Sequence, residues 1–205
     1  MTSEEAEDEW ANARSFSRLC ELTAQWLEGK LPFYPGYASE SPDPETTELI
    51  PILAAFNRAG FLTEFSQPAE GDCGSGSAQR AAVAGFAMEP LAKQIGCLSL
   101  STDLYVGIFP PNVEWGYQLP ISMHEFRPTT WCGATINADS DPLAESCRPE
   151  ASAELGSCWL VQVIDLRWGR KSHLWSNLKR AIGGRLPSEY SVEPLHSETI
   201  GDFIY

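Results

Sequence analysis

Hydrophobic positions along the chain first outline helices. Between residues 8 and 28, apolar side chains recur every three or four residues, as in an amphipathic helix that ends at Gly29. Acidic residues 4–9 lie at the start of this helix, where negative charge complements the helix dipole. The residues predicted to face the core are Phe16, Leu19, Cys20, Thr23, Trp26 and Leu27.

A second helix is predicted to follow a proline-rich loop. Asp43 and Pro44 suit the N-cap and the first helical position, and Gly60 supplies the stop. Pro51 either kinks this helix or marks a later start. Asn57 shares a face with Ile50 and Leu53, so its amide is directed inward.

Extended segments dominate the middle of the chain. The strand after Gly60 closes at Ser66-Gln67-Pro68. Residues 79–88 carry small side chains on both faces, which indicates burial against a helix or a ligand. Residues 158–164 are the most apolar segment and are expected to be central in the sheet. Strands are predicted at 61–65, 79–88, 98–100, 104–109 and 158–164, with one or two more within 112–137.

Two further helices and two loops complete the pattern. Short and long helices are expected at 90–96 and from Ser172 to Ile182, the latter burying Leu174, Trp175, Leu178 and Ile182. Residues 71–77 are rich in glycine and serine and indicate a flexible surface loop that could serve as a lid. Residues 139–156 suggest a polar surface loop, and the apolar end of the tail favours docking.

This order of elements differs from the strand–helix alternation of a doubly wound sheet. The fold class expected is therefore α+β, with a mixed or antiparallel sheet covered by helices. No internal repeat is visible, and residues 1–205 are expected to form a single domain.

Composition and charge exclude several classes of protein. Hydrophobic residues make up 43% of the 205 positions, which is typical of a globular chain. No apolar run reaches the ~20 residues that span a bilayer, and the acidic N-terminus differs from a signal peptide. A cytoplasmic protein without membrane contact is expected. The net charge of −14 disfavours nucleic-acid binding.

The sequence gives little support for a metal site or for a catalytic nucleophile. The six cysteines form no C-x-x-C pair and lie at no zinc spacing from a histidine, so no metal or other cofactor is expected. Cys20 and Cys158 fit a core, whereas Cys132 is a weak candidate nucleophile. His124 suits either a structural partner or an acid–base role.

Polar residues instead cluster around the helix–strand junction. The candidate binding residues are Asn57, Thr63, Ser66, Gln67, Gln79 and Arg80, with Trp131 as a wall. Arg80 could hold an anion or form a structural ion pair, and Asn57 could contact a ligand or brace a loop. Asp43, Glu45 or Asp165 could act as the base if burial raised its pKa. The cluster can form only if the strands after Gly60 and after Ala78 are neighbours.

The same stretch resembles a known family. It resembles the sequences of uncharacterised proteins from high-GC actinobacteria and some of their phages. The resemblance lies in the pattern E-T-x-x-L-I-P-x-L-x-x-x-N-x-x-G-F-x-T-x-x-S-Q-P, followed by Q-R-A-A-V-x-G-F. The similarity extends over about the first 90 residues. The family carries the label of a domain of unknown function, so the resemblance implies a shared site without assigning roles.

Two function hypotheses follow. The first is an enzyme of bacterial specialised metabolism that acts on a polar small molecule with an anionic group. A ring-closing displacement of sulfate or phosphate, such as aziridine formation, would need only an arginine, a base and proximity. The second is a non-enzymatic acidic interaction protein, or a phage or host regulator. Assembly into a homo- or hetero-oligomer is left open.

Overall fold

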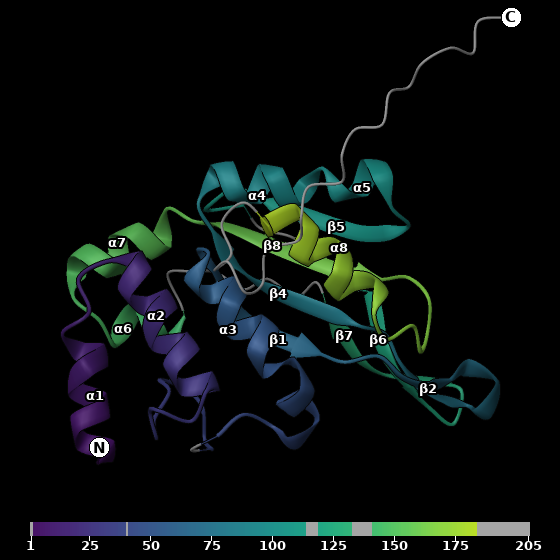
Figure 1. Ribbon diagram of the computed structural model, residues 1–205, viewed down its shortest axis with the longest axis horizontal. Coiled ribbons are helices and arrows are strands. Elements are labelled where there is room, and N and C mark those ends of the chain that lie inside the picture. The colour runs from purple at the N-terminus through teal and green to yellow at the C-terminus, as the bar shows by residue number, and fades with distance from the viewer. Residues whose placement is uncertain (1, 40, 114–118, 133–140, 184–205) are drawn as a thin grey trace, which may run out of the picture.

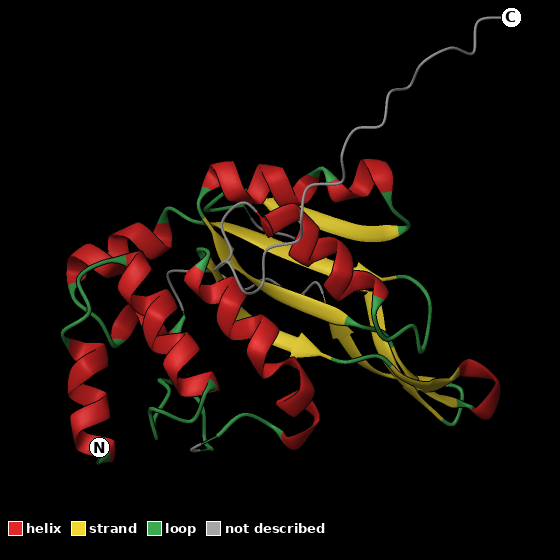
Figure 2. Ribbon diagram, viewed as in Figure 1, coloured by secondary structure: helices red, strands yellow, loops and turns green. Residues whose placement is uncertain are grey.

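The computed structural model describes residues 2–39, 41–113, 119–132 and 141–183. Within them lie helices and two four-stranded antiparallel sheets (Figures 1 and 2). The α+β class with antiparallel strands covered by helices is confirmed, whereas the second sheet was not anticipated. Trp115 and the tail after Gly183, both considered above, lie outside the described residues.

The first sheet contains the most apolar strands. Its order is β1 (Phe61–Gln67), β4 (Ala82–Ala87), β8 (Trp159–Asp165) and β5 (Leu104–Phe109), with every neighbouring pair antiparallel. β8 is an interior strand, as predicted from its continuous apolar run. The pairing of β1 with β4 confirms that the strands after Gly60 and after Ala78 are neighbours, as the predicted polar cluster requires.

The second sheet extends to one side of the first (Figure 1). It contains β2 (Glu70–Asp72), β3 (Ser77–Gln79), β6 (Leu119–His124) and β7 (Arg127–Cys132). The single strand predicted at 79–88 is therefore wrong, because the chain passes from one sheet to the other at Arg80. The Arg80 N–H bonds to the Ile121 carbonyl at 2.8 Å, which ties the crossover to β6.

The predicted loop at 71–77 is a hairpin rather than an unstructured lid. β2 and β3 pair on either side of a 3₁₀ turn, η2 (Cys73–Ser75). Gly71 and Gly76 have φ angles of 68° and 81°, so the glycines provide the left-handed conformations that this tight connection requires. The glycine signal was therefore correct for a turn, and the pairing of β2 with β3 was not predicted.

The N-terminal amphipathic segment forms two helices instead of one. They are α1 (Ser3–Ala11) and α2 (Phe16–Leu27). The break arises because the Ser15 hydroxyl accepts a hydrogen bond from the Arg18 N–H and caps a new helix. α2 buries the predicted apolar residues and is followed by Gly29 at φ 71°.

The second predicted helix also divides in two. A 3₁₀ segment, η1 (Pro44–Leu49), precedes α3 (Ile50–Arg58), so Pro51 marks a later start. Asp43 occupies the N-cap position of η1, but its side chain makes no capping hydrogen bond. Gly60, at φ 93°, connects α3 to β1.

Among the described residues after β4, five further segments are α-helical. They are α4 (Glu89–Gly96), α5 (Leu98–Ser101), α6 (Pro142–Glu145), α7 (Pro149–Gly156) and α8 (His173–Ile182). The strand expected at 98–100 is wrong, since Leu98 begins the short helix α5. The surface loop expected at 139–156 is also wrong, because α6 and α7 bury Leu143, Ala151 and Leu155.

Helices cover one face of the first sheet. α3 packs on β1, while α4 and α8 pack on β8 (Figures 1 and 2). The main core lies between these helices and the sheet, and a smaller apolar cluster on the other face joins Ala82 and Ala84 to Ile121 and Ile164. The small residues of β4 are therefore buried on both faces, as predicted. α2 packs on α3, beyond the edge strand β1.

Candidate functional site

A cavity lies where α2, η1, α3 and the edge strand β1 meet. Its volume is about 150 Å³. Four of the residues predicted from sequence line it: Asp43, Glu45, Thr63 and Ser66. The other lining residues are Trp26, Leu27, Tyr34, Tyr37, Pro42, Thr46, Leu53, Glu64 and Phe65. Part of the predicted cluster therefore surrounds one concave site.

Glu64 enters this cavity from an irregularity in β1. Thr63 pairs with Gly85 and Phe65 with Ala84, which leaves Glu64 as an extra, bulged residue. A β-bulge redirects side chains and is frequent beside active sites. The opposite strand accommodates it because Gly85 lacks a side chain, and a Cβ atom there would collide with the Leu62 carbonyl. The bulge therefore sets the position from which the Glu64 carboxyl reaches the cavity.

Asn57 fixes the strand just before the bulge. Its amide nitrogen donates to Thr63 Oγ1 at 2.7 Å and to the Leu53 carbonyl at 2.9 Å. Its amide oxygen accepts from the Thr63 N–H at 3.1 Å. Asn57 is fully buried, and these bonds occupy the side chain. Of the two roles left open by the sequence, bracing describes what Asn57 does here.

Gln67 fixes the strand after the bulge. Its amide nitrogen donates to the carbonyls of Arg80 and Ile121 at 3.1 and 3.0 Å. Its amide oxygen accepts from the Ser122 hydroxyl at 2.9 Å. These contacts join β1 to the sheet crossover and to β6, so Gln67 supports the site without lining it. Asn57 and Gln67 thus hold β1 on both sides of Glu64.

Glu64 forms a proton-sharing pair with Asp141, the N-cap residue of α6. Burial, followed by the charge and the hydrogen bond of the nearby Asp141, raises the pKa of Glu64 to about 8, against the opposing effect of the Tyr34 hydroxyl, which lowers it. Burial also raises the pKa of Asp141, while hydrogen bonds from the Leu143 N–H and Glu64 lower it. Asp141 accepts from that N–H at 2.9 Å. Near neutral pH, the proton therefore resides on Glu64, whose carboxyl group donates a hydrogen bond to the Asp141 carboxylate.

Tyr34 links this pair to an aromatic wall. Its hydroxyl donates to Glu64 Oε1 at 3.0 Å. The rings of Trp26 and Tyr34 lie 4.8 Å apart between centroids, and those of Trp26 and Tyr37 lie 5.1 Å apart. Burial and the adjacent Glu64 raise the pKa of Tyr34 well above its usual value, so its hydroxyl stays protonated. The wall is therefore apolar on its faces, with a hydrogen-bond donor directed at Glu64.

Carboxylates surround the entrance of the cavity. Asp43 and Glu45 are exposed, and Tyr37 makes a side-chain hydrogen bond to Asp43. Burial and this bond raise the pKa of Tyr37, which makes it a lasting donor to Asp43. No lysine or arginine occurs among the lining residues that the structure describes. The electrostatic character of the cavity is therefore acidic.

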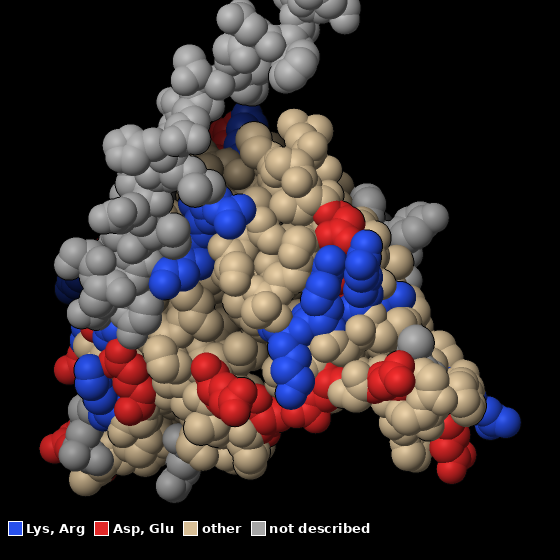
Figure 3. All heavy atoms as spheres, turned by 45° about the vertical axis from the view of Figure 1, so that its right-hand side comes forward, with Lys and Arg blue, Asp and Glu red and all other residues tan. Residues whose placement is uncertain are grey.

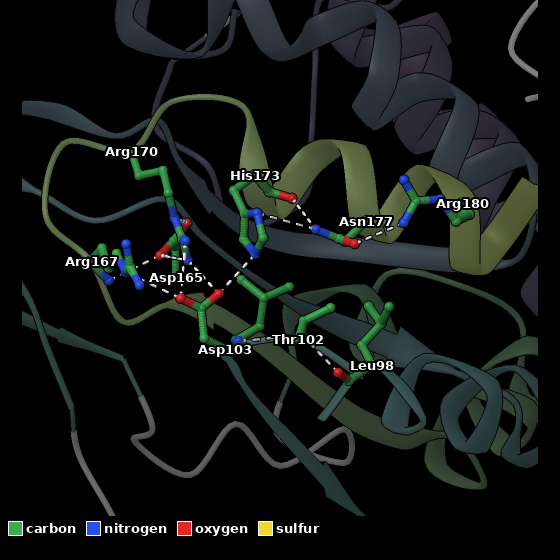
Figure 4. A network of polar contacts seen from close by, with 10 residues as sticks. Leu98, Thr102, Asp103, Asp165, Arg167, Arg170, His173, Asn177 and Arg180 are labelled. Atoms are coloured by element: carbon green, nitrogen blue, oxygen red, sulfur yellow. Dashed lines mark hydrogen bonds and ion pairs between the residues drawn. The ribbon is translucent and has the colours of Figure 1, made fainter. Parts of the chain in front are cut away.

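Asp165, the third predicted base, lies in a separate network (Figure 4). Its buried carboxylate accepts from Nε and Nη2 of Arg170, both at 2.7 Å, and from the Arg167 N–H at 2.9 Å. Arg170 also contacts Asp103 at 2.8 and 3.0 Å, and His173 Nε2 lies 2.9 Å from the same carboxylate. The Arg170 hydrogen bonds hold the pKa of Asp103 at about 2. Both carboxylate oxygens of Asp165 are thus engaged in hydrogen bonds, which gives this residue a structural role away from the cavity.

Arg80 and Gln79 do not line the cavity. Arg80 Nη1 donates to the Pro120 carbonyl at 2.9 Å, and the guanidinium carbon lies 4.2 Å from the centroid of a Trp168 ring. Burial lowers the pKa of Arg80. The Gln79 carbonyl accepts from the Gly169 N–H at 3.0 Å. Both residues therefore anchor the loop after β8 to the junction of the two sheets.

The remaining predicted residues also lie elsewhere. Trp131 lies on β7 with 48% of its surface exposed. His124 Nδ1 lies 3.0 Å from the Ser77 hydroxyl, which gives it the structural partner considered above. Cys20 and Cys158 are buried, as predicted. Over residues 2–39, 41–113, 119–132 and 141–183, no three His, Cys, Asp or Glu residues are placed to hold a metal ion.

Charge is distributed unevenly over the surface. On the face shown in Figure 3, Lys and Arg atoms lie in several groups, and the one right of centre is bordered by Asp and Glu atoms. The loop after β8 contributes Arg167, Arg170 and Lys171, and α8 adds Lys179 and Arg180. These cations belong to other elements than those lining the cavity. Lys171 nevertheless lines a concave surface together with Glu45 and Glu48, so cations and carboxylates adjoin one another.

Glu64 of the cavity and its partner Asp141 were not predicted from the sequence. Glu64 occupies an unassigned position of the T-x-x-S-Q-P motif, and Asp141 lies in a segment interpreted as a loop. The signal that could have indicated Glu64 is Gly85, since an isolated glycine within a strand often marks a bulge in its neighbour. Asp141 precedes Pro142, an N-cap signature that was available in the sequence.

The comparisons identify a family and no activity. Residues 5–185 match the model of a family described as a domain of unknown function, DUF6919. The chain therefore belongs to this family, and the match extends well beyond the first 90 residues. No curated protein matches the sequence. Among the helices of the described residues, none combines the length and apolarity that crossing a membrane requires.

Proposed function

We propose that this protein binds a polar small molecule in the cavity beside Glu64 and transfers a proton to or from it. The observation that carries the proposal is the Glu64–Asp141 pair, placed by a β-bulge at a cavity whose wall also holds Tyr34. A carboxyl group with a pKa near the working pH is suited to general acid–base catalysis. Glu64 is the proton-transferring group, and Asp141 and Tyr34 set its protonation state.

The sequence-based reaction is retained as the finer proposal. In a ring-closing displacement, an amine nitrogen loses a proton to a carboxylate and forms a bond to carbon. The carbon–oxygen bond to sulfate or phosphate breaks, and the anion leaves with the bonding electrons. Asp43 and Glu45 supply carboxylates at the cavity, and Glu64 can accept the proton once it has lost its own. Arg80 lies outside it, so this geometry supports the deprotonation step better than the binding of the leaving anion.

The biological context of the protein is proposed from the family resemblance rather than from the site. We propose a cytoplasmic protein of actinobacteria or their phages that acts in specialised metabolism. The non-enzymatic interaction protein remains the second candidate. It is supported by the complete internal pairing of Asn57 and Gln67, which is typical of bracing residues.

The test has a binding step and a catalytic step. The full-length protein is screened by ¹⁵N NMR against polar amines, amino alcohols, amides and their sulfate and phosphate esters. The amides of Thr46, Thr63 and Ser66 serve as reporters of the cavity. Any ligand found is then incubated with the parent and with Glu64→Gln. The proposal predicts retained binding and a rate at least ~10²-fold lower in the variant.

The control is Glu70→Gln, which removes an exposed carboxylate on β2. It should leave both binding and rate unchanged. Turnover by Glu64→Gln at the parent rate would overturn the catalytic role of Glu64. If no compound in the panel moves the reporter amides, the interaction-protein candidate is favoured instead.

A further inference from the structure

The walls of the cavity differ in chemical character. One wall consists of the rings of Trp26, Tyr34 and Tyr37, which lie within 5.1 Å of one another in consecutive pairs. The entrance contributes the carboxylates of Asp43 and Glu45, and the carboxyl group of Glu64, which is protonated near neutral pH, also lines the cavity. Aromatic faces attract cations through their quadrupole, and carboxylates attract them through charge. The combination is that of a cation site rather than an anion site.

The hydrogen-bonding state of Trp26 is a second, independent observation. Trp26 lines the cavity with only 7% of its surface exposed. Its indole N–H has no hydrogen-bond partner within the described part of the chain. Buried donors are seldom left unpaired, so an acceptor is missing at this position. The nitrogen is closed off from the cavity, so an acceptor oxygen on a bound molecule would complete it only after the indole ring turns toward the cavity.

Cavity size limits the molecule. A volume of about 150 Å³ is comparable to cavities that enclose a benzene ring, so roughly six to ten non-hydrogen atoms fit. A nucleotide or a peptide is too large to be enclosed. The net charge of −14 adds a long-range attraction for small cations.

We infer that the cavity takes a small amine cation, protonated or quaternary, that also carries an acceptor oxygen, as an amino alcohol does. The ammonium group lies against the aromatic wall, close to Asp43 and Glu45. The oxygen accepts from the Trp26 N–H. This inference rests on the proposed function, because it names the substrate class of the same cavity.

The test compares two molecules of nearly equal shape. Choline carries a quaternary ammonium group, and 3,3-dimethyl-1-butanol replaces that group by a neutral tert-butyl group. Binding to the full-length protein is followed through the Thr46, Thr63 and Ser66 amides in ¹⁵N NMR titrations, with sodium acetate as the anionic probe. We expect choline to bind at least tenfold more tightly than the neutral alcohol, and acetate to leave these amides unmoved.

Variants test which carboxylates attract the bound cation. The double variant Asp43→Asn/Glu45→Gln should weaken choline binding about fivefold to tenfold. The control Glu70→Gln/Asp72→Asn changes the net charge equally on the exposed strand β2 and should alter the dissociation constant less than twofold. Trp26→Phe keeps an aromatic ring but removes the N–H, and should weaken choline binding without abolishing it.

Failure of this inference is distinct from failure of the proposed function. If the neutral alcohol or acetate binds in the cavity as tightly as choline, the cation inference is overturned and the binding function stands. The cation inference also fails if the Asp43/Glu45 and Glu70/Asp72 variants behave alike. If none of the three probes moves the reporter amides, the cation inference is overturned. The wider ester and amide panel then decides the proposed function separately.

Discussion

Gly85 packs against the main chain of Thr63 so closely that a Cβ atom at Gly85 would lie 2.9 Å from the Thr63 Cα. The two residues are register partners in β4 and β1, and the bulge that presents Glu64 follows immediately. The glycine is therefore a condition for the geometry of the cavity, although it lies in the buried middle of the sheet.

The first prediction is that Gly85→Ala destabilises the fold. The methyl group would displace β1, at a cost of about 1–3 kcal/mol in the free energy of unfolding. Urea denaturation measures this cost. The control is Gly183→Ala, where a Cβ atom meets nothing within 4 Å and φ is −48°. It should leave stability unchanged or slightly raised, and equal effects of the two variants would contradict the close approach.

The second prediction concerns the pH dependence of stability. The pKa of Glu64 is about 8 in the folded protein against 4.5 as its ordinary value. The native state therefore binds more protons than the unfolded state between these values, and stability falls as the pH rises through 8. At ~1.4 kcal/mol per pKa unit, we expect a loss of about 4 kcal/mol between pH 5 and pH 9.

Glu64→Gln should remove most of this slope, because its amide stays neutral throughout. Urea denaturation at several pH values compares the variant with the parent. The exposed-site variant Glu70→Gln should retain the parental slope. A parental stability that is constant or rises over this range would show that Glu64 is ionised in the native state.

Much of the fold was accessible from the sequence. Apolar spacing predicted α2, α3 and α8, and the continuous apolar run of β8 predicted an interior strand. These predictions were correct because the spacing of apolar residues reflects which side of a helix or strand is buried. α5 and the pair α6–α7 were missed, because short helices with few apolar residues lack a clear period.

The site was only partly accessible. The inward direction of Asn57 followed from helical spacing. Thr63 and Ser66 were predicted as members of the polar cluster and Asp43 and Glu45 as candidate bases, and all four line the cavity. Glu64 could not be assigned by alternation, because a bulge breaks the period of two. Its pairing with Asp141 is a long-range contact between a strand and a distant helix cap, which no local pattern encodes.

The third prediction concerns Tyr34. Its hydroxyl lowers the pKa of Glu64 by donating to Oε1. Tyr34→Phe should therefore raise the pKa of Glu64 above about 8, by roughly one unit. The side-chain carboxyl ¹³C shift measures this midpoint. Tyr37→Phe is the matched control, since the Tyr37 hydroxyl bonds to Asp43 instead. A lower midpoint in Tyr34→Phe would contradict the donor role.

The fourth prediction concerns the network in Figure 4. Asp165 is fully buried, and Arg170 neutralises it through two bonds of 2.7 Å. Arg170→Met should cost about 3–5 kcal/mol of stability, because it leaves a buried carboxylate without its cation. Arg167→Ala removes a side chain that is 71% exposed and should cost less than about 1 kcal/mol. Urea denaturation of both variants decides whether Asp165 is a structural anion.

The protonation of Glu64 near neutral pH is the claim on which the proposed function depends. It is measured most directly by the carboxyl ¹³C shift of Glu64 between pH 4 and pH 10 in ¹³C-glutamate-labelled protein, with the signal assigned by its loss in Glu64→Gln. The account predicts a titration midpoint at about 8. A midpoint between 4 and 5 would show an ordinary ionised carboxylate and would contradict the account.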